Sequence, residues 1–424
     1  MQHAIDEKKF GALGAPMVAA VQACVHCGFC LTACPTYREL GQEMDTPRGR
    51  IVLMKQVLEG TIPAAAAQPH IDRCLGCLAC EPACPSGVAY RDLISPFRAL
   101  MSEEPAFAAK RTAGERMRRW LVSKTVPHPA RFRLAARAGA LAKRLGFLTP
   151  PPLRPMLDLV PDAVPRAAAL PEVSPARGER RARVALLAGC AQQVLEPGIN
   201  LATIDVLTRN GVEVVVPRAQ ACCGGLAWHT GDLAAARSFA RRNLAAFPAD
   251  VDAVVTNAAG CGSALHEYPL MLKGTEDEAR AQALAGRTID VSVFLLRLGL
   301  RELPQARDSL LRIAYHDACH LANAQGVRAE PRDLLRAIPG VEILEIADPH
   351  LCCGSAGSYN IDQPAIAASL GEQKARAVIA TEADVVATGN IGCLTQLRTH
   401  LARLDSHLRV RHTVQVLRDA YDST

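Results

Sequence analysis

The stretch Cys24-Val-His-Cys27-Gly-Phe-Cys30-Leu-Thr-Ala-Cys34-Pro35 decides the fold of the first part of this chain. It recurs as Cys74-Leu-Gly-Cys77-Leu-Ala-Cys80-Glu-Pro-Ala-Cys84-Pro85, with the same spacing C-x-x-C-x-x-C-x-x-x-C-P. Zinc sites usually use paired C-x-x-C knuckles instead. Three thiolates at intervals of three residues can wrap a loop around one small inorganic core, so the two runs indicate bound iron and sulfur.

A cubane cluster needs a fourth thiolate, which a single run of this kind does not supply. In two-cluster ferredoxins the last cysteine of each run ligates the cluster of the other run. Two [4Fe-4S] clusters are therefore predicted, one held by Cys24, Cys27, Cys30 and Cys84, the other by Cys74, Cys77, Cys80 and Cys34.

The segment between the two runs favours a helix. Apolar residues recur at helical spacing in Arg48–Leu58, directly after Thr46-Pro-Arg-Gly-Arg50. Small bacterial ferredoxins have a shorter gap, and the longer insert resembles the α-helical ferredoxin domain of respiratory dehydrogenase iron–sulfur subunits. We expect such a domain over residues 1–110.

The second half of the chain repeats itself. A short apolar run precedes Cys190 and another precedes Cys319, each suited to a buried strand. Each half continues with a second strand and Cys-Cys-Gly, then a helical stretch, a third strand and a last cysteine. This alternation predicts two related α/β units with short parallel sheets, over residues 181–305 and 306–424. With the helical N-terminal domain, the fold class is α+β multidomain.

The remaining eight cysteines form one set of four in each repeat. We expect them at the ends of strands, where α/β folds build their sites. The candidate metal ligands are Cys190, Cys222, Cys223 and Cys261 in the first repeat, and Cys319, Cys352, Cys353 and Cys393 in the second. Three interpretations stay open: a further iron–sulfur cluster in one or both repeats, zinc or an empty remnant, and a redox-active vicinal disulfide. His316, His320 and His350 flank the second set and could ligate or tune a metal.

A basic and proline-rich region, residues 111–180, separates the ferredoxin domain from the repeats. Twelve Lys and Arg residues lie between Lys110 and Arg154. They form either a solvated helical surface or a contact with anionic lipid or an acidic partner. Proline crowds the second half of Pro127–Gly178, which we interpret as a semi-rigid extended connector.

Several classes of protein are excluded by what the sequence lacks. The chain offers no run of eighteen uncharged apolar residues and no secretory signal, so we expect a cytoplasmic protein with metal-bound cysteines. No stacking array or DNA-reading motif suggests nucleic-acid binding. No G-x-G-x-x-G follows a strand, so no flavin or nicotinamide site and no catalytic residue are predicted here.

The repeats resemble the cysteine-rich CCG domain found in heterodisulfide reductases, in anaerobic glycerol-3-phosphate dehydrogenase and in lactate-utilisation proteins. The fullest CCG pattern closes each site with C-x-x-C and holds a noncubane [4Fe-4S] cluster with five cysteines. This chain has Ala264 after Cys261 and Asn390 before Cys393, which leaves four cysteines per site.

The whole arrangement is similar to the iron–sulfur subunit of glycolate oxidase (glycolate dehydrogenase). The segments His316–Arg328, Leu351–Asn360 and Thr388–Cys393 carry the resemblance, with Ala318 where that family usually has proline. The resemblance implies a complex with two FAD-containing subunits that oxidise glycolate to glyoxylate. This chain would pass their electrons to a quinone or another respiratory acceptor, with peripheral contact at the inner face of the cell membrane. The alternatives are a heterodisulfide reductase-like thiol/disulfide oxidoreductase subunit, and the iron–sulfur subunit of a glycerol-3-phosphate or lactate dehydrogenase.

Overall fold

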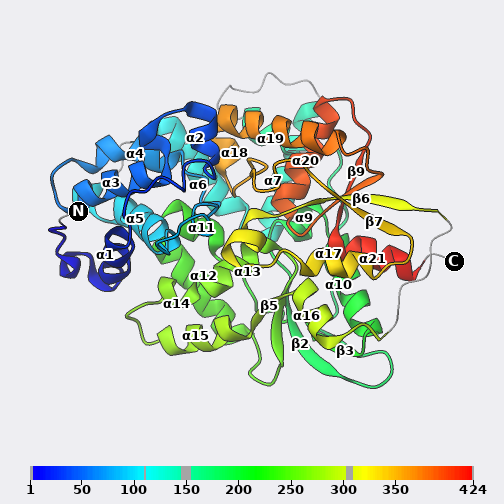
Figure 1. Ribbon diagram of the computed structural model, residues 1–424. Coiled ribbons are helices and arrows are strands. Elements are labelled where there is room, and N and C mark those ends of the chain that lie inside the picture. The colour runs from blue at the N-terminus through cyan, green and yellow to red at the C-terminus, as the bar shows by residue number, and fades with distance from the viewer. Residues whose placement is uncertain (1–2, 109–110, 145–153, 302–308, 423–424) are drawn as a thin grey trace.

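The structure, a computed structural model, describes residues 3–108, 111–144, 154–301 and 309–422. The N-terminal part is helical (Figure 1). After a 3-10 helix, Glu7–Leu13, its helices are α1 (Gly14–Gln22), α2 (Pro35–Leu40), α3 (Pro47–Leu58), α4 (Ala64–Asp72) and α5 (Arg91–Glu103). The side chain of Thr46 caps α3 by accepting a hydrogen bond from the N–H of Gly49, and Pro47 suits the first helical position. The predicted helix between the cysteine runs is therefore present.

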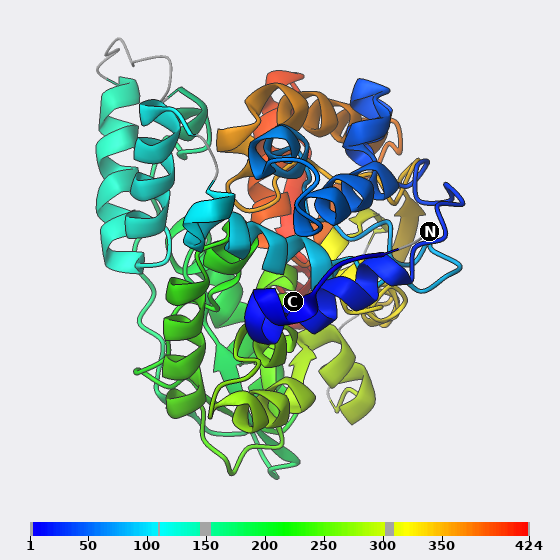
Figure 2. The same cartoon turned by 90° about the vertical axis from the view of Figure 1, so that its left-hand side faces the viewer.

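Helices α6 (Ala113–Thr125) and α7 (Pro129–Arg144) pack against each other as a hairpin at one side of the molecule (Figure 2), followed by α8 (Arg154–Asp158). Thr112 and Glu115 form a capping box that starts α6. The predicted extended connector is wrong for its first part, because residues 129–144 form α7. Their alanines, leucines and arginines are strong helix formers, and a proline is favoured at a helix start. Residues 145–153 of the predicted connector lie outside the described residues.

The first repeat alternates strands and helices. Its strands are β1 (Val173–Ser174), β2 (Ala182–Leu187), β3 (Val212–Val215), β4 (Ala253–Thr256) and β5 (Thr288–Asp290). Its helices are α9 (Gln192–Leu195), α10 (Gly198–Arg209), α11 (Gly225–Thr230), α12 (Leu233–Ala246), α13 (Ala259–His266), α14 (Tyr268–Met271), α15 (Glu278–Arg287) and α16 (Val291–Leu298).

The second repeat follows the same plan. Its strands are β6 (Leu311–His316), β7 (Val341–Glu345), β8 (Val385–Thr388) and β9 (Arg409–His412). Its helices are a π-helix (His320–Ala324), α17 (Glu330–Arg336), α18 (Tyr359–Asp362), α19 (Pro364–Ile379), α20 (Ile391–Arg403) and α21 (Thr413–Tyr421). Among the described helices, none has both the length and the apolar character that a membrane crossing requires.

Each repeat has its own sheet. The strand order is β1-β3-β2-β4-β5 in the first and β7-β6-β8-β9 in the second. All pairings are parallel except that of β1 with β3. The predicted α/β units with short parallel sheets are therefore present. Buried parallel strands are apolar on both faces, which accounts for the continuous apolar runs before Cys190 and Cys319.

The two repeats share one hydrophobic core. Val184 and Leu186 of β2 lie in the same cluster as Ile313 and Tyr315 of β6. The last helix of each repeat packs on a helix near the start of the other: α21 contacts α10, and α16 contacts α17. The repeats are thus joined by exchanged helices as well as by a common core.

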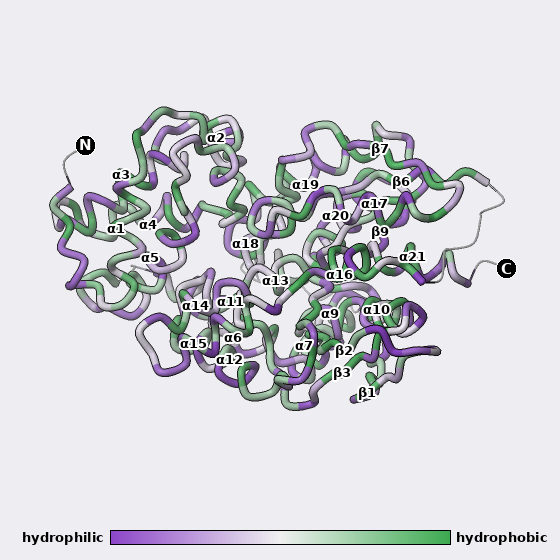
Figure 3. The backbone as a smooth tube through the Cα atoms, turned by 60° about the horizontal axis from the view of Figure 1, so that its bottom comes forward, coloured by the Kyte–Doolittle hydropathy of each residue, from purple (hydrophilic) through white to green (hydrophobic). Residues whose placement is uncertain are grey.

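The helical N-terminal part lies against both repeats (Figure 3). Helix α5 contacts α11 of the first repeat, and α2 contacts α19 of the second. A hydrogen bond of 3.0 Å joins the guanidinium of Arg91 to the carbonyl oxygen of Ala324. This packing brings the two cysteine runs close to the strand ends of the repeats.

A substitution at Gly231 tests the contact between α5 and α11. It ends α11 with a φ of +90°, and a Cβ at this position would overlap the carbonyl oxygen of Arg98. We expect Gly231→Ala to lower the free energy of unfolding by at least about 1–2 kcal/mol, the cost of left-handed backbone alone. Denaturant titration of anaerobically purified protein measures this change.

The control is Gly286→Ala in α15, where an added Cβ meets nothing within 4 Å. It should leave stability unchanged or raise it by up to about 1 kcal/mol, because alanine favours a helix over glycine. Equal stability of the two variants would show that the close approach at Gly231 does not hold this contact.

Candidate metal centres

The two cysteine runs at the N-terminus fold as loops with the same backbone turns. His26 and Leu78 have φ values of 56° and 57°, and the corresponding positions in the other run are Gly76 and Gly28, also at positive φ. Left-handed backbone is rare outside glycine and persists where the surrounding structure requires it. The repeated turns shape both loops around small cavities that their cysteines line.

Each cavity is lined by cysteines from both runs. The first is lined by Cys24, Cys27, Cys30 and Cys84, and the second by Cys34, Cys74, Cys77 and Cys80. Cys80 also contributes to the wall of the first. The four cysteines of the second set are buried, whereas Cys27 in the first set is exposed. Each group of four donors expected to share a cluster thus lies together, with three from one run and one from the other.

Burial makes the second set depend on cationic neighbours. It raises the pKa of both Cys77 and Cys80 well above the ordinary value. Burial also opposes ionisation of Cys74, but Arg50 and Arg98 outweigh it and leave the pKa of that thiol lowered. Thiolates are the metal-binding form of cysteine, so the environment suits a centre that replaces the thiol protons with metal ions.

Arg50 is the buried cation of this region. Its guanidinium lies 3.4 Å from the carboxylate of Asp45 and 3.8 Å from the sulfur of Cys34, and donates to the carbonyl oxygen of His70 at 2.7 Å. A buried arginine is retained where ion pairs and hydrogen bonds satisfy it. It belongs to the segment Thr46–Arg50 that favoured the α-helical ferredoxin domain, so the sequence contained a signal for this residue.

Arg98 links the second set to the first repeat. From α5 it donates to the carbonyl oxygens of Ile71 at 2.8 Å, Cys74 at 2.6 Å and His229 at 2.9 Å. Sequence reasoning missed Arg98, because one arginine within an amphipathic helix has no distinguishing pattern.

All eight cysteines of the repeats line one chamber of about 290 Å³. In both repeats the cysteines follow strands β2, β3 and β4 or their counterparts β6, β7 and β8, as expected for parallel sheets. Cys74 of the ferredoxin loop lines the same chamber. The pairs Cys222–Cys223 and Cys352–Cys353 lie in loops, where two neighbouring residues can both face inward as they cannot in a regular strand.

Sulfur atoms approach one another within each repeat set. The sulfurs of Cys190 and Cys222 are 3.5 Å apart in the first. In the second, Cys319 contacts Cys352, and Cys353 contacts Cys393. The hydrogen bond with Cys352 and burial raise the pKa of Cys319 well above its ordinary value. At Cys353 the hydrogen bond with Cys352 lowers the pKa, but the contact with Cys393 and burial outweigh it and leave the pKa raised. Converging soft donors in a cysteine-lined chamber fit iron–sulfur or zinc centres.

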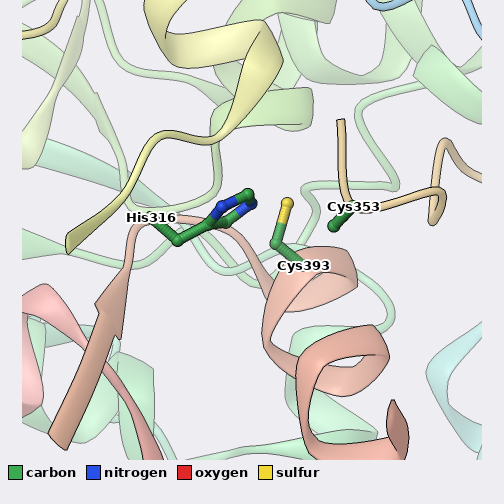
Figure 4. Close-up of side chains that lie close together, drawn as sticks. All are labelled: His316, Cys353 and Cys393. Atoms are coloured by element: carbon green, nitrogen blue, oxygen red, sulfur yellow. The ribbon is translucent and has the colours of Figure 1, made fainter. Parts of the chain in front are cut away.

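The three flanking histidines occupy different positions. His316 is buried beside Cys353 and Cys393, with donor atoms of all three within 4.8 Å of one another (Figure 4), and burial lowers its pKa to about 3. His320 lines the chamber and stacks edge-on to His229, with ring centroids 5.3 Å apart. His350 is exposed and lies 3.2 Å from the guanidinium of Arg328. Of these three histidines, His316 is the one that lies with two cysteine sulfurs in a group that could hold a metal ion.

The pairing register of the two sheets shows which positions of the two repeats are equivalent, and this corrects where the fifth cysteine is missing. Leu187 pairs with Thr256, and His316 pairs with Thr388. Cys261 and Cys393 each lie five residues after those threonines, so they are equivalent. Ala264 and Asn390, the two departures from the five-cysteine pattern expected from the sequence, do not correspond in this register. The position equivalent to Asn390 is Ala258, and Asn390 donates to the sulfur of Cys393 at 3.5 Å.

Some arginines of the basic region line an internal chamber. Arg111, Arg118 and Arg119 line the chamber of the repeat cysteines, and Arg111 donates to the carboxylate of Asp72 at 2.8 Å. Arg119 lies 3.7 Å from the same carboxylate. Neither interpretation made from the sequence included this role, because the spacing of basic residues does not show which of them meet an internal acid.

Comparison with known proteins agrees with the cysteine patterns. Residues 20–88 match the 4Fe-4S dicluster domain family, and residues 184–266 and 313–398 each match the cysteine-rich domain family. The chain is 32% identical over 237 residues to lactate utilization protein A of Geobacillus kaustophilus, an alignment that covers 55% of this chain and 98% of that protein.

Two relatives match over nearly the whole length. The chain is 38% identical over 418 residues to a probable glycolate oxidase iron-sulfur subunit of Bacillus subtilis, covering 94% of this chain and 93% of the relative. It is 35% identical over 425 residues to the glycolate oxidase iron-sulfur subunit of Escherichia coli, covering 98% of each. The chain therefore belongs to the family of glycolate oxidase iron–sulfur subunits.

Proposed function

We propose that this chain is the electron-transfer subunit of a flavin-dependent glycolate dehydrogenase complex. The observation that carries the proposal is that the cysteine sets adjoin one another in series, from an exposed loop to a chamber between the repeats. In this proposal the first set and the second set, defined above by the two small cavities, each hold a [4Fe-4S] cluster. Such clusters accept and release one electron at a time.

Contact between the second set and the second repeat supports a continuous route. Leu75 and Cys77 lie in one apolar cluster with Leu351 and Cys352. The side-chain amide of Asn323 donates to the carbonyl oxygen of Cys77 at 3.0 Å. This buried, closely packed contact gives electrons a short path between the ferredoxin loops and the second repeat.

We place the entry for electrons at the exposed loop of the first set. Val25 and Phe29 flank Cys27 there, and each is 67% exposed. Exposed apolar side chains close to a redox site suit the docking of a partner protein. The partners in the proposal are two FAD-binding subunits, in which glycolate loses two electrons and two protons and becomes glyoxylate. The reduced flavin then gives up its electrons singly to this chain.

We place the exit near the hairpin α6–α7. An apolar cavity of about 610 Å³ lies between this hairpin, α8 and the loops of the second repeat, and shares Val122, Val126 and Ile391 with the walls of the cysteine chamber. Its volume and apolar walls suit a quinone, which would take up two electrons and two protons.

The outer surface of the hairpin supports peripheral membrane contact. Trp120 and Leu134 are 58% and 72% exposed, and Met117 and Leu141 are also exposed. Basic residues lie on the same helices. A helix pair with exposed apolar and basic side chains can bind at the surface of an anionic bilayer.

Co-purification tests the proposed complex. We expect the tagged chain, co-expressed with its FAD-binding partners, to purify with flavin that glycolate reduces. The double variant Val25→Glu/Phe29→Glu should retain at most about a tenth of that flavin, because charges would enter the apolar centre of the interface. Leu201→Glu, at an exposed leucine of α10, is the matched control and should retain all of it. Equal flavin in all three proteins would contradict the docking site. A purified flavoprotein that glycolate does not reduce would contradict the proposal that glycolate is the substrate of the complex.

The exchange of ligands between runs gives a second test. We expect Cys34→Ala to remove the cluster bound by Cys74, Cys77 and Cys80, although Cys34 follows Cys30 in sequence. Cys84→Ala should remove the cluster of the other run. Electron paramagnetic resonance during a redox titration separates the two signals. The proposal fails if each substitution abolishes the cluster of its own run alone.

A further inference from the structure

His316 ends strand β6 in a position where its side chain faces the cysteines of the second repeat. It is 1% exposed and pairs in register with Thr388 of β8. Leu187 is its counterpart at the end of β2, paired with Thr256 of β4. The two repeats therefore differ in the chemistry available at one equivalent site, since one has an imidazole and the other an aliphatic group.

Neither ring nitrogen of His316 has a hydrogen-bond partner among the described residues. Buried polar side-chain atoms normally have a partner, and an exception requires an explanation such as a bound ion. His412 shows the ordinary case: equally buried, it lies with Nε2 2.8 Å from the carbonyl oxygen of Asn257 and accepts from the N–H of Val414 at its other nitrogen. The unpartnered nitrogens of His316 thus point to a ligand at this site.

The groups around the imidazole identify that ligand. A ring nitrogen of His316 and the sulfurs of Cys353 and Cys393 lie within 4.8 Å of one another, and Figure 4 shows His316 and Cys393 converging from the ends of β6 and α20. The three side chains are 1%, 1% and 3% exposed. Imidazole nitrogen and thiolate sulfur together are a donor set for iron–sulfur and zinc centres.

We propose that His316 is a ligand of the metal centre in the second repeat, so that this centre has a nitrogen donor besides the thiolates of Cys319, Cys352, Cys353 and Cys393. At the equivalent position the first repeat has Leu187, which offers no donor, so its centre lacks a counterpart of this nitrogen ligand. The inference rests on the proposed function only in that the repeat cysteines bind metal.

The nitrogen donor gives the two centres different electronic properties. Imidazole is neutral, whereas a further thiolate would add a negative charge. In iron–sulfur centres, histidine in place of cysteine raises the reduction potential. A centre with His316 would therefore take up an electron more readily than one with a fifth cysteine at that site.

The test is pulsed electron paramagnetic resonance on the whole chain, purified anaerobically with ¹⁵N-labelled histidine. Metal analysis of the wild type and of Cys319→Ala first measures how much metal the second repeat binds. We expect a histidine nitrogen coupling in the wild type that is lost in His316→Leu, the side chain that the first repeat carries. His350→Leu, at the exposed histidine nearby, should keep the coupling.

A second variant distinguishes loss of the nitrogen ligand from loss of the fold. His316→Cys offers a soft donor in the same place, so we expect it to retain the metal but to lose the nitrogen coupling. The proposal is overturned if the coupling persists in His316→Leu, if the metal-loaded wild type shows none, or if the second repeat binds no metal. If the metal is zinc, X-ray absorption at the zinc edge replaces electron paramagnetic resonance. Loss of one nitrogen ligand from the zinc in His316→Cys would then confirm His316 as a ligand, but zinc at this site would refute electron transfer through this repeat.

Discussion

Four sulfur atoms must converge on a space of a few ångströms, and no short segment of this chain can bring four cysteines there alone. In the N-terminal domain two loops with matching left-handed turns each contribute three cysteines to one cavity and their last cysteine to the other, and Cys80 lines both cavities. In each repeat the donors come from the segments that follow three different strands, and the last cysteine lies in the first turn of a helix, α13 or α20. Parallel pairing solves the problem there, because it aligns the carboxyl ends of neighbouring strands.

The same constraint accounts for the buried charges. Thiols in a dry environment resist ionisation, and Arg50 and Arg98 offset this at Cys74, where they lower the pKa of the thiol. Arg98 at the same time donates to His229 of the first repeat. The side chain of Arg98 thus lowers the pKa of Cys74 and also connects the ferredoxin loops to the first repeat. At the second repeat, Lys374 is fully buried, and its ammonium donates to the carbonyl oxygen of Asp348 at 2.7 Å.

Local patterns predicted most of the fold, whereas three-dimensional relationships escaped them. The spacing around Cys24 and Cys74 indicated which cysteines lie together, since a single ligand geometry explains both runs. Apolar runs before Cys190 and Cys319 indicated buried strands. Residues 129–144 fell both in the basic region, for which a helical surface was one interpretation, and in the expected extended connector; they form helix α7. The chamber shared by both repeats could not be predicted, because it depends on the core common to β2 and β6 and on the exchange of α16 and α21.

The central proposal is that all four cysteine sets bind iron and adjoin one another. Iron and acid-labile sulfide per chain, measured on protein purified anaerobically in the absence of added metal, test it most directly. The account predicts clearly more than about eight iron atoms per chain, the content of two [4Fe-4S] clusters, with the excess lost in a variant that lacks Cys223 and Cys353. A content of about eight iron atoms that this variant leaves unchanged would restrict the iron to the ferredoxin loops and contradict the account.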